Sequence, residues 1–358
     1  MSPTRVVHVI APGEVEDLRH PTGGNAYDVA LVAALRATGR LVALHPVAGT
    51  WSAPSPADLH RLRDVLAALP DGAKVLADGL LAGAAPDVLA EAQRRLRMVV
   101  LVHMPPPVPE GPDPDAGARP VLAGAAAVVA TSSWTRDRVL ELGGPTPERV
   151  HVVPPGVAPA PLADADPAGR RLLCVASVVP AKGHDLLLDA LATLLDREWR
   201  LVCVGDLTRD PPHVLALRRR LGRLALAQRV KFVGPLRGAE LAREYAASDL
   251  HVLATRAEGY GMVLTESLAR GVPVVATEIG GVPEAVGRVG GGERPGILVP
   301  PDDREALAGA LGSWLASRSL RATLRSRARE RRTTLGRWED AAAEVARVLD
   351  AVAVGTGR

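Results

Sequence analysis

The sequence predicts an α/β protein made of two doubly wound domains. Short apolar runs, suited to buried parallel strands, alternate with helix-forming segments, and this alternation occurs twice along the chain. A segment rich in Pro, Ala and Asp at residues 158–169 separates the two halves, and such a composition is typical of a linker. The length of 358 residues allows each half to bury a core of its own.

The boundaries of the expected elements follow from the apolar runs and from the Gly and Pro residues between them. The strands of the first half are expected at residues 6–10, 41–44, 75–77, 99–102, 128–130 and 150–154. Those of the second half are expected at residues 172–177, 201–204, 230–233, 249–253, 274–276 and 297–301. We therefore predict an N-terminal domain at residues 1–160, a C-terminal domain at residues 161–335 and a last helix at residues 336–358.

The composition favours an ordinary enzyme without a transmembrane segment. No apolar run approaches the roughly 20 residues that a membrane span needs, and the N-terminus lacks a basic-then-apolar signal. Cys174 and Cys203 each lie in an apolar run, which favours two core residues over a disulfide or a metal pair. These features predict a cytoplasmic protein.

The charge is distributed unevenly between the two halves. Residues 1–165 carry 14 basic and 17 acidic residues, a net charge of −3, whereas the remainder carries 29 and 23, a net charge of +6. A basic half suits a ligand such as a nucleoside diphosphate. The arginines at residues 218–229 are interpreted as a solvated helix face, and nucleic-acid binding is not expected.

Residues 253–286 carry the strongest functional pattern. Glu258 precedes a predicted helix at residues 262–270, and Glu266 follows eight positions later within it. Free amides at the N-terminus of such a helix, from residues 261–263, favour an anion and above all a phosphate. A carboxylate on either side can accept hydrogen bonds from sugar hydroxyls. An isolated acidic pair of this spacing usually only improves the helix dipole, but the loops EGYG and GGVPE around it favour a nucleotide-sugar site.

The segment EGYGMVLTESLARGVPVVATEIGGVPEAV resembles the donor-binding signature of the retaining glycosyltransferases of family 4, which have the GT-B fold. Further matches extend the resemblance over nearly the whole chain. It implies two Rossmann-like domains that face a cleft, with the donor on the second, the acceptor on the first, and the last helix crossing back onto the first. It also implies transfer of a hexosyl group with retention, from a UDP-sugar or GDP-sugar, without a metal or another cofactor.

The resemblance implies catalytic roles for three residues, Lys182, Glu258 and His103. The lysine belongs to a segment similar to the family's R-x4-K-G loop and would steady the departing diphosphate as a point charge. Ser177 stands where the family has its arginine, which removes one of two cations. Glu258 would hold sugar hydroxyls, Glu266 would hold the ribose diol, and the strand-end histidine would bond a donor hydroxyl.

The expected donor-binding residues lie in loops or turns that follow predicted strands, or in the helix predicted at residues 262–270. They are Gly23, Gly24, Lys182, Gly183, Gly234, Leu236, Glu258, Gly259, Tyr260, Gly261, Met262, Val263 and Glu266. The glycine pair at residues 23–24 lets a ligand approach the backbone, although it is also consistent with a flexible helix start. The segment at residues 234–236 resembles the family's F-x-G stretch beside the nucleobase.

The acceptor is expected to be a small molecule, a glycan or a lipid-linked sugar, selected by loops at residues 13–22 and 105–120. The acidic triplets at residues 113–115 and 164–166 lie in proline-rich loops, so no metal site is predicted there. Two other functions stay open. The first is a nucleotide-sugar epimerase of the same fold, and the second is a non-catalytic nucleotide-sugar-binding protein, which Ser177 suggests.

Three smaller motifs have simple structural interpretations. Ser132 or Ser133 is expected to cap a helix. Asp302, with Glu305 three residues later, resembles a helix N-terminal cap. The turn at residues 155–158 resembles the family's NGVD turn but lacks its Asn and Asp, so it is expected to be structural.

Overall fold

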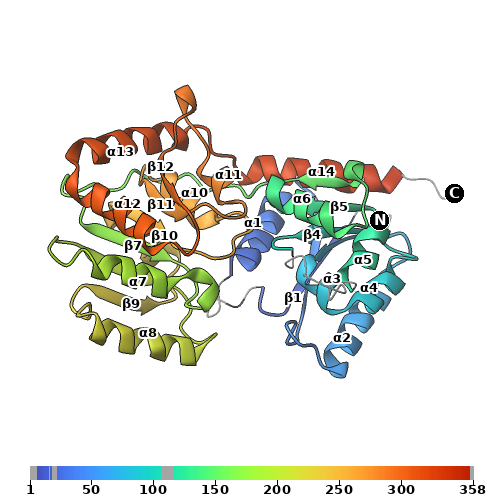
Figure 1. Ribbon diagram of the computed structural model, residues 1–358. Coiled ribbons are helices and arrows are strands. Elements are labelled where there is room, and N and C mark those ends of the chain that lie inside the picture. Colours follow the sequence, from blue (N-terminus) through green and yellow to red (C-terminus); the bar gives the residue numbers. More distant parts are fainter. Residues whose placement is uncertain (1–5, 16, 18–21, 106–116, 355–358) are drawn as a thin grey trace. The chain divides into compact units, whose positions relative to one another are not determined.

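A computed structural model describes residues 6–15, 17, 22–105 and 117–354 (Figure 1). The described residues form two compact units. Those up to residue 156, apart from Thr22, and those from residue 336 onward make the first unit, and residues 157–335 belong to the second. The segments at residues 106–116 and 18–21, which contain most of the expected acceptor loops, and the triplet at 113–115 lie outside the described residues.

The first unit contains a parallel six-stranded sheet with the order β2-β1-β3-β4-β5-β6. Its strands are β1 (Val6–Pro12), β2 (Leu41–Val47), β3 (Lys74–Asp78), β4 (Arg97–Val102), β5 (Ala127–Ala130) and β6 (Val150–Val152). Its helices are α1 (Gly23–Ala37), α2 (Pro56–Ala67), α3 (Gly79–Ala84), α4 (Pro86–Ala92), α5 (Ala118–Gly124), α6 (Ser133–Leu142) and α14 (Trp338–Val354). The middle strands are buried and apolar because helices cover both faces of the sheet.

The second unit contains another parallel six-stranded sheet, with the order β12-β11-β10-β7-β8-β9. Its strands are β7 (Arg171–Val175), β8 (Arg200–Val204), β9 (Val230–Gly234), β10 (Leu250–Leu253), β11 (Val274–Thr277) and β12 (Gly296–Val299). Its helices are α7 (His184–Ala192), α8 (Pro211–Arg223), α9 (Gly238–Ala247), α10 (Met262–Leu268), α11 (Val282–Val286), α12 (Arg304–Ala316) and α13 (Arg318–Arg332). Cys174 and Cys203 are free, buried and paired in register on β7 and β8.

The prediction of two doubly wound α/β domains is confirmed by these sheets. In each sheet the strand order reverses at one point, between β1 and β3 in the first unit and between β10 and β7 in the second. Open parallel sheets bind ligands beyond the carboxyl ends of the strands at such a point. The loops that follow these four strands are therefore the first places to look for a site.

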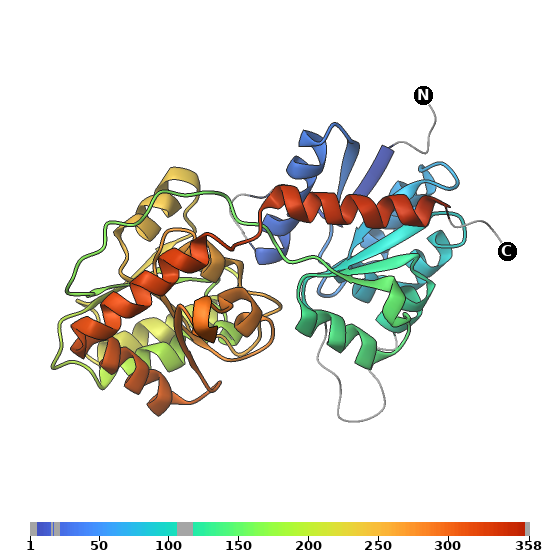
Figure 2. The same ribbon diagram turned by 90° about the horizontal axis from the view of Figure 1, so that it is seen from above.

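The last helix, α14, belongs to the first unit and packs on α1 (Figure 2). Its entry depends on Gly156, because a Cβ at this position would lie 2.1 Å from the backbone nitrogen of Trp338. The Trp338 ring then packs edge-on against Tyr27 of α1, with 5.3 Å between ring centroids. The turn that resembles NGVD is thus used for close backbone packing.

The expected cap at Asp302 is wrong by one residue. Asp303 is the N-cap of α12, and its carboxylate accepts a hydrogen bond from Ala306 N–H at 2.8 Å. Asp302 instead has a left-handed backbone, with φ of 56°, and its carboxylate accepts from Arg256 at 2.6 Å. Ser132 caps α6 by accepting from Thr135 N–H at 3.0 Å.

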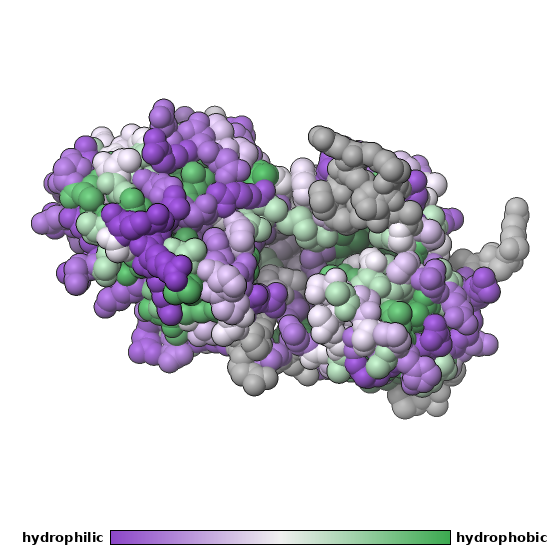
Figure 3. Space-filling model, turned by 60° about the horizontal axis from the view of Figure 1, so that its bottom comes forward, coloured by the Kyte–Doolittle hydropathy of each residue, from purple (hydrophilic) through white to green (hydrophobic). Residues whose placement is uncertain are grey.

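Polar and apolar residues intermix over the face shown in Figure 3. Among the described residues, none of the helices combines the length and the apolar character needed to cross a membrane.

Candidate functional site

The candidate donor half-site lies in the second unit, at the carboxyl ends of the adjacent strands β7 and β10. After β7 the chain runs through a short 3-10 helix, Pro180–Lys182, into α7. After β10 it runs through residues 254–261 into α10. The sheet order places these loops side by side although about 75 residues separate them in the chain.

Lys182 and Glu258 meet where these two loops come together. The Lys182 Nζ donates to Glu258 Oε2 at 2.7 Å, and the two side chains are 25% and 17% exposed. Partial burial makes this charged hydrogen bond stronger than a surface ion pair while leaving both groups accessible. The structure thus brings together two of the three predicted catalytic residues.

Arg256 fastens the two loops to each other. Its guanidinium donates twice to the Asp185 carboxylate, at 2.9 Å each, and once to Pro180 O at 2.7 Å. Its backbone N–H donates to Ala181 O at 2.7 Å. The hydrogen bonds that it donates to Asp185 and to Asp302 raise the pKa of this guanidinium, so Arg256 is a fixed cation.

Glycines permit the close approach of these loops. Gly183 has φ of 64°, and a Cβ there would lie 1.9 Å from Ala254 O. Gly280 has φ of 57°, and its Cβ would lie 1.9 Å from Glu258 O. Gly281 N–H donates to that same carbonyl at 3.0 Å. The GG pair of the GGVPE loop therefore supports the backbone that carries Glu258.

Glu266 on α10 is positioned by a buried tyrosine. Its Oε2 accepts from Tyr245 Oη at 2.9 Å, and the Tyr245 ring is stacked under Arg270, whose Cζ lies 4.7 Å from the ring centroid. Burial raises the pKa of Glu266, while Tyr245 and Arg270 oppose that shift. Burial also raises the pKa of Tyr245, which keeps its hydroxyl a hydrogen-bond donor.

The other donor residues predicted in the second half of the chain lie in the same unit. Gly234 ends β9 with φ of 79°, and Leu236 is partly buried against the cluster that contains Tyr245. Gly259, Tyr260 and Gly261 are buried, and Met262 and Val263 are half-buried on α10. Burial raises the pKa of Tyr260 to about 12.

His103 follows β4 in the first unit and lies beside two buried carboxylates. Its Nε2 is 2.9 Å from Asp28 Oδ1 on α1 and 3.9 Å from Asp78 Oδ2 at the end of β3. Asp78 also accepts from Leu80 N–H at 2.6 Å. Asp28 Oδ2 is buried and has no hydrogen-bond partner among the described residues. Within those residues, this is also the group whose ligand atoms are close enough to hold a metal ion, all within 4.8 Å.

The electrostatics of this cluster favour a shared proton. Burial and then the Asp28 charge raise the pKa of Asp78 to about 7, and the His103 charge opposes the shift. Burial lowers the pKa of His103, but the charge and hydrogen bond of Asp28 outweigh it, so the net shift is upward. Both shifts favour proton binding within this cluster.

The predicted glycine pair at the start of α1 divides into two different positions. A Cβ on Gly24 would lie 3.1 Å from His103 Cδ2, so this glycine makes room for the imidazole. A Cβ on Gly23 would meet nothing within 4 Å. The His103 ring also packs edge-on against Tyr27, with 5.1 Å between centroids.

Three residues of these half-sites were missed from the sequence: Arg256, Tyr245 and Asp28. Arg256 stands two positions before Glu258, and the sequence around it does not indicate which distant carboxylates it binds. Asp28 is a polar residue within an apolar helical segment, and this was the one available signal that it is buried.

These features define an α/β protein of the GT-B class, with a lysine–carboxylate pair at the switch point of its second sheet. The fold resembles that of sucrose-phosphate synthase from Thermosynechococcus elongatus, with a TM-score of 0.77 and 20% identity over 97% of this chain and 99% of the other. It also resembles Anabaena HepE in complex with UDP-glucose, with a TM-score of 0.76 and 20% identity over 97% and 99%.

Sequence comparison adds a family match and several relatives. Residues 169–317 match the family described as glycosyl transferases group 1. A D-inositol 3-phosphate glycosyltransferase of Jonesia denitrificans is 31% identical over 69% of this chain and 64% of its own length. A GDP-mannose-dependent alpha-(1-6)-phosphatidylinositol monomannoside mannosyltransferase of Mycobacterium tuberculosis is 30% identical over 62% and 61%.

The resemblance to the family 4 glycosyltransferases is confirmed by these matches, and residues 169–317 are the part that matches the group 1 family. The matched part of the chain spans less than two thirds of the length of these curated relatives.

We predict that Gly280→Ala disrupts the donor half-site. The new Cβ would force the Glu258 backbone to move, and the positive φ adds strain, so unfolding should become easier by about 2 kcal/mol or more. Gly309→Ala in α12 is the control, since its Cβ meets nothing within 4 Å. This control should raise stability by roughly 0.5–1 kcal/mol, the usual gain for a helix interior. Equal urea midpoints for the two variants would contradict the packing described.

We also predict that Asp78 makes stability fall as pH rises. The folded protein keeps this proton up to about pH 7, whereas the ordinary value is 3.8, so its contribution is full below pH 4 and lost by pH 7. Asp78→Asn can still accept from Leu80 N–H but cannot titrate. The variant should show a smaller loss of unfolding free energy between pH 5 and pH 8 in urea titrations. Asp71→Asn, whose side chain is 83% exposed, should behave like the unchanged protein.

Proposed function

We propose that the protein is a retaining hexosyltransferase that moves a sugar from a nucleoside diphosphate donor to an acceptor hydroxyl. The observation that carries this proposal is the Lys182–Glu258 pair, 2.7 Å apart at the switch point of the second sheet and next to the start of α10. A cation and a carboxylate in contact suit a ligand that joins a diphosphate to a polyhydroxylated sugar.

The proposed division of roles follows the chemistry of each group. Lys182 exchanges its bond to Glu258 for the diphosphate and stabilises the charge that grows there as the sugar departs. The first-turn amides of Met262 and Val263, which have no acceptor within the helix, add donors to the same phosphates. Glu258 then accepts from sugar hydroxyls, and Glu266 accepts from the ribose diol.

Arg256 is not proposed as the second cation of the diphosphate site. Its guanidinium is held by two carboxylates, Asp185 and Asp302, and by a carbonyl. With Ser177 in place of the family arginine, Lys182 carries the larger share of charge stabilisation. The attack is proposed to occur on the face from which the diphosphate departs, and the acceptor proton passes to the departing phosphate oxygen. No side-chain nucleophile and no metal ion take part.

The relatives suggest the donor and acceptor classes. One is named for GDP-mannose and one structure contains UDP-glucose, so UDP- and GDP-hexoses are the proposed donors. The named acceptors include an inositol phosphate and a phosphatidylinositol mannoside, so the proposed acceptor is a small polyol, a glycan or a lipid-linked sugar. No nucleic acid is proposed as a partner.

The first test is a thermal-shift panel of nucleoside diphosphates and their sugars, with EDTA present. A ligand that binds the folded state alone raises the melting temperature, and the shift grows with the logarithm of its concentration above Kd. We expect one base class to give a shift that Glu266→Ala abolishes and Glu305→Ala, an exposed control on α12, preserves. The donor assignment fails if no nucleotide shifts the protein, or if the shift survives in Glu266→Ala.

Turnover is the second test. Lys182→Ala should lower kcat by about 10²-fold, the usual cost of losing one transition-state donor. Lys231→Ala, which removes an exposed lysine on β9 of the same unit, should leave kcat unchanged. Release of free nucleoside diphosphate together with a glycosylated acceptor distinguishes transfer from epimerisation, in which the sugar stays on the nucleotide. An undiminished kcat in Lys182→Ala would refute the proposed role.

A further inference from the structure

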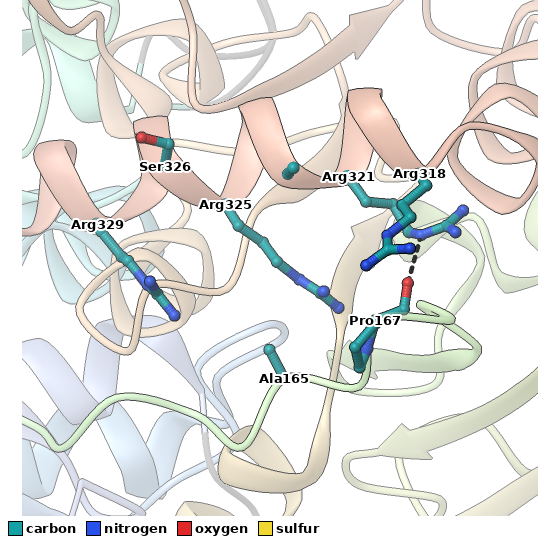
Figure 4. Close-up of a pocket in the computed structure, with 8 residues that line it drawn as sticks. Ala165, Pro167, Arg318, Arg321, Arg325, Ser326 and Arg329 are labelled. Carbon is teal, nitrogen blue, oxygen red and sulfur yellow. Dashed lines mark hydrogen bonds between the residues drawn. The ribbon is translucent and has the colours of Figure 1, made fainter.

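A basic pocket lies in the second unit, between α13 and the segment at residues 165–167 (Figure 4). Its volume is about 380 Å³, within the roughly 300–1,000 Å³ range of small-molecule sites. Its lining residues are Ala165, Pro167, Arg318, Arg321, Ala322, Arg325, Ser326 and Arg329. Four of these eight are arginines and none is acidic.

The pocket is separate from the candidate donor half-site. Arg325 lies 3.3 Å from Asp249, which immediately precedes β10, and Asp249 also binds Arg171, the first residue of β7. The pocket is therefore at the amino edge of the sheet. Lys182 and Glu258 follow the carboxyl ends of the same two strands. Because parallel strands all run the same way, these two regions lie at opposite edges.

The acidic groups near the pocket, Asp249 and Asp166, each act on more than one arginine. Asp249 is fully buried and is shared between Arg171 and Arg325. Arg321 is 7% exposed, and its guanidinium donates to three carbonyls, those of Pro167, Trp314 and Leu315. Carbonyls satisfy its donors but do not neutralise its charge.

Two of the four arginines have a clear structural role. Arg321 donates to Pro167 O at 2.9 Å, and Arg325 donates to Asp166 O at 2.5 Å, so both secure the segment that enters β7. The Arg325 Nε atom is nevertheless buried without an acceptor among the described residues. Burial, together with Arg321 and Arg171, lowers the pKa of Arg325, although Asp249 and Asp166 oppose that shift. An anion would relieve this unfavourable burial of charge.

The other two arginines have no such role. Arg318 and Arg329 are exposed and make no hydrogen bond or ion pair with any residue in the described part of the chain. They lie seven positions before and four after Arg325, spacings that place all three on one side of a helix. Figure 4 shows the three side chains extending from α13 toward Ala165 and Pro167.

We propose that this arginine pocket binds a phosphate group, presented as inorganic phosphate, as a soluble phosphate ester or as a phospholipid headgroup. Guanidinium groups bind phosphate oxygens in pairs, and a phosphate offers three or more acceptors to several arginines at once. The cavity is larger than a phosphate alone requires, which leaves room for the group that carries it. The proposal does not depend on the sugar-transfer reaction.

The test is calorimetric titration of the whole chain with inorganic phosphate, with total ionic strength held constant by NaCl so that general screening is the same throughout. Lys182→Ala serves as the background, so that phosphate at the donor half-site does not contribute. We expect saturable binding that the added pair Arg318→Ala/Arg329→Ala weakens at least tenfold. Both positions are exposed, so the fold should persist, as far-UV circular dichroism can verify.

The matched control is Arg218→Ala/Arg219→Ala, which removes the same charge from an exposed face of α8. This pair should bind phosphate with unchanged affinity. Equal loss in both pairs would show that net charge alone attracts the anion, and that result would overturn the proposal. Absence of saturable phosphate binding in the background protein, together with absence of vesicle binding that depends on Arg318 and Arg329, would also overturn it.

Vesicles distinguish the two sources of the phosphate group. Sedimentation with phosphatidylglycerol vesicles, compared with neutral phosphatidylcholine vesicles, reports a headgroup as the occupant. If phosphatidylglycerol binding requires Arg318 and Arg329 and is displaced by inorganic phosphate, the pocket takes a lipid headgroup. If only the soluble anion binds, the occupant is a soluble phosphate, either inorganic or esterified.

Discussion

The guanidinium of Arg256 is the contact on which the candidate donor half-site depends. It binds Asp185 and Asp302 and a carbonyl of the preceding loop, so it joins the ends of two strands that are neighbours in the sheet but distant in the chain. These charge-assisted hydrogen bonds together offset the conformational entropy that the two loops lose when they become ordered. Because Arg256 is committed to these bonds, the proposed function assigns the anionic ligand to Lys182 instead.

The two units use the same topology for different electrostatic environments. In the second unit, a lysine and a carboxylate neutralise each other at the switch point and stay partly exposed. In the first, two carboxylates and a histidine lie close together away from water, and burial with the Asp28 charge raises the pKa of Asp78 to about 7. A partly exposed ion pair can separate to bind the charged and polar groups of a ligand, whereas a buried cluster of acids with a histidine can hold or share a proton.

The basic character of the second half has a larger structural component than its net charge of +6 suggests. Arg321, Arg331 and Arg332 on α13 donate to backbone carbonyls of neighbouring segments, including Val286 and Ala160. These arginines donate hydrogen bonds to backbone carbonyls that have no partner within a helix or a sheet of the described residues. Arg318 and Arg329, on the same helix, have no such role among the described residues. Their side chains line the proposed phosphate pocket and do not hold neighbouring segments of the described chain in place.

The sequence by itself determined the order of strands and helices, the loops that carry Lys182 and Glu258 and the helix that carries Glu266, because these follow from local periodicity and from glycine and proline. Only the tertiary structure decided which residues meet. Tyr245 donates a hydrogen bond to Glu266 from another helix. Asp303 rather than Asp302 caps α12, because the carboxylate of Asp302 binds the distant Arg256. These pairings depend on contacts between segments far apart in the chain, and a local sequence pattern does not specify which distant residues a side chain will contact.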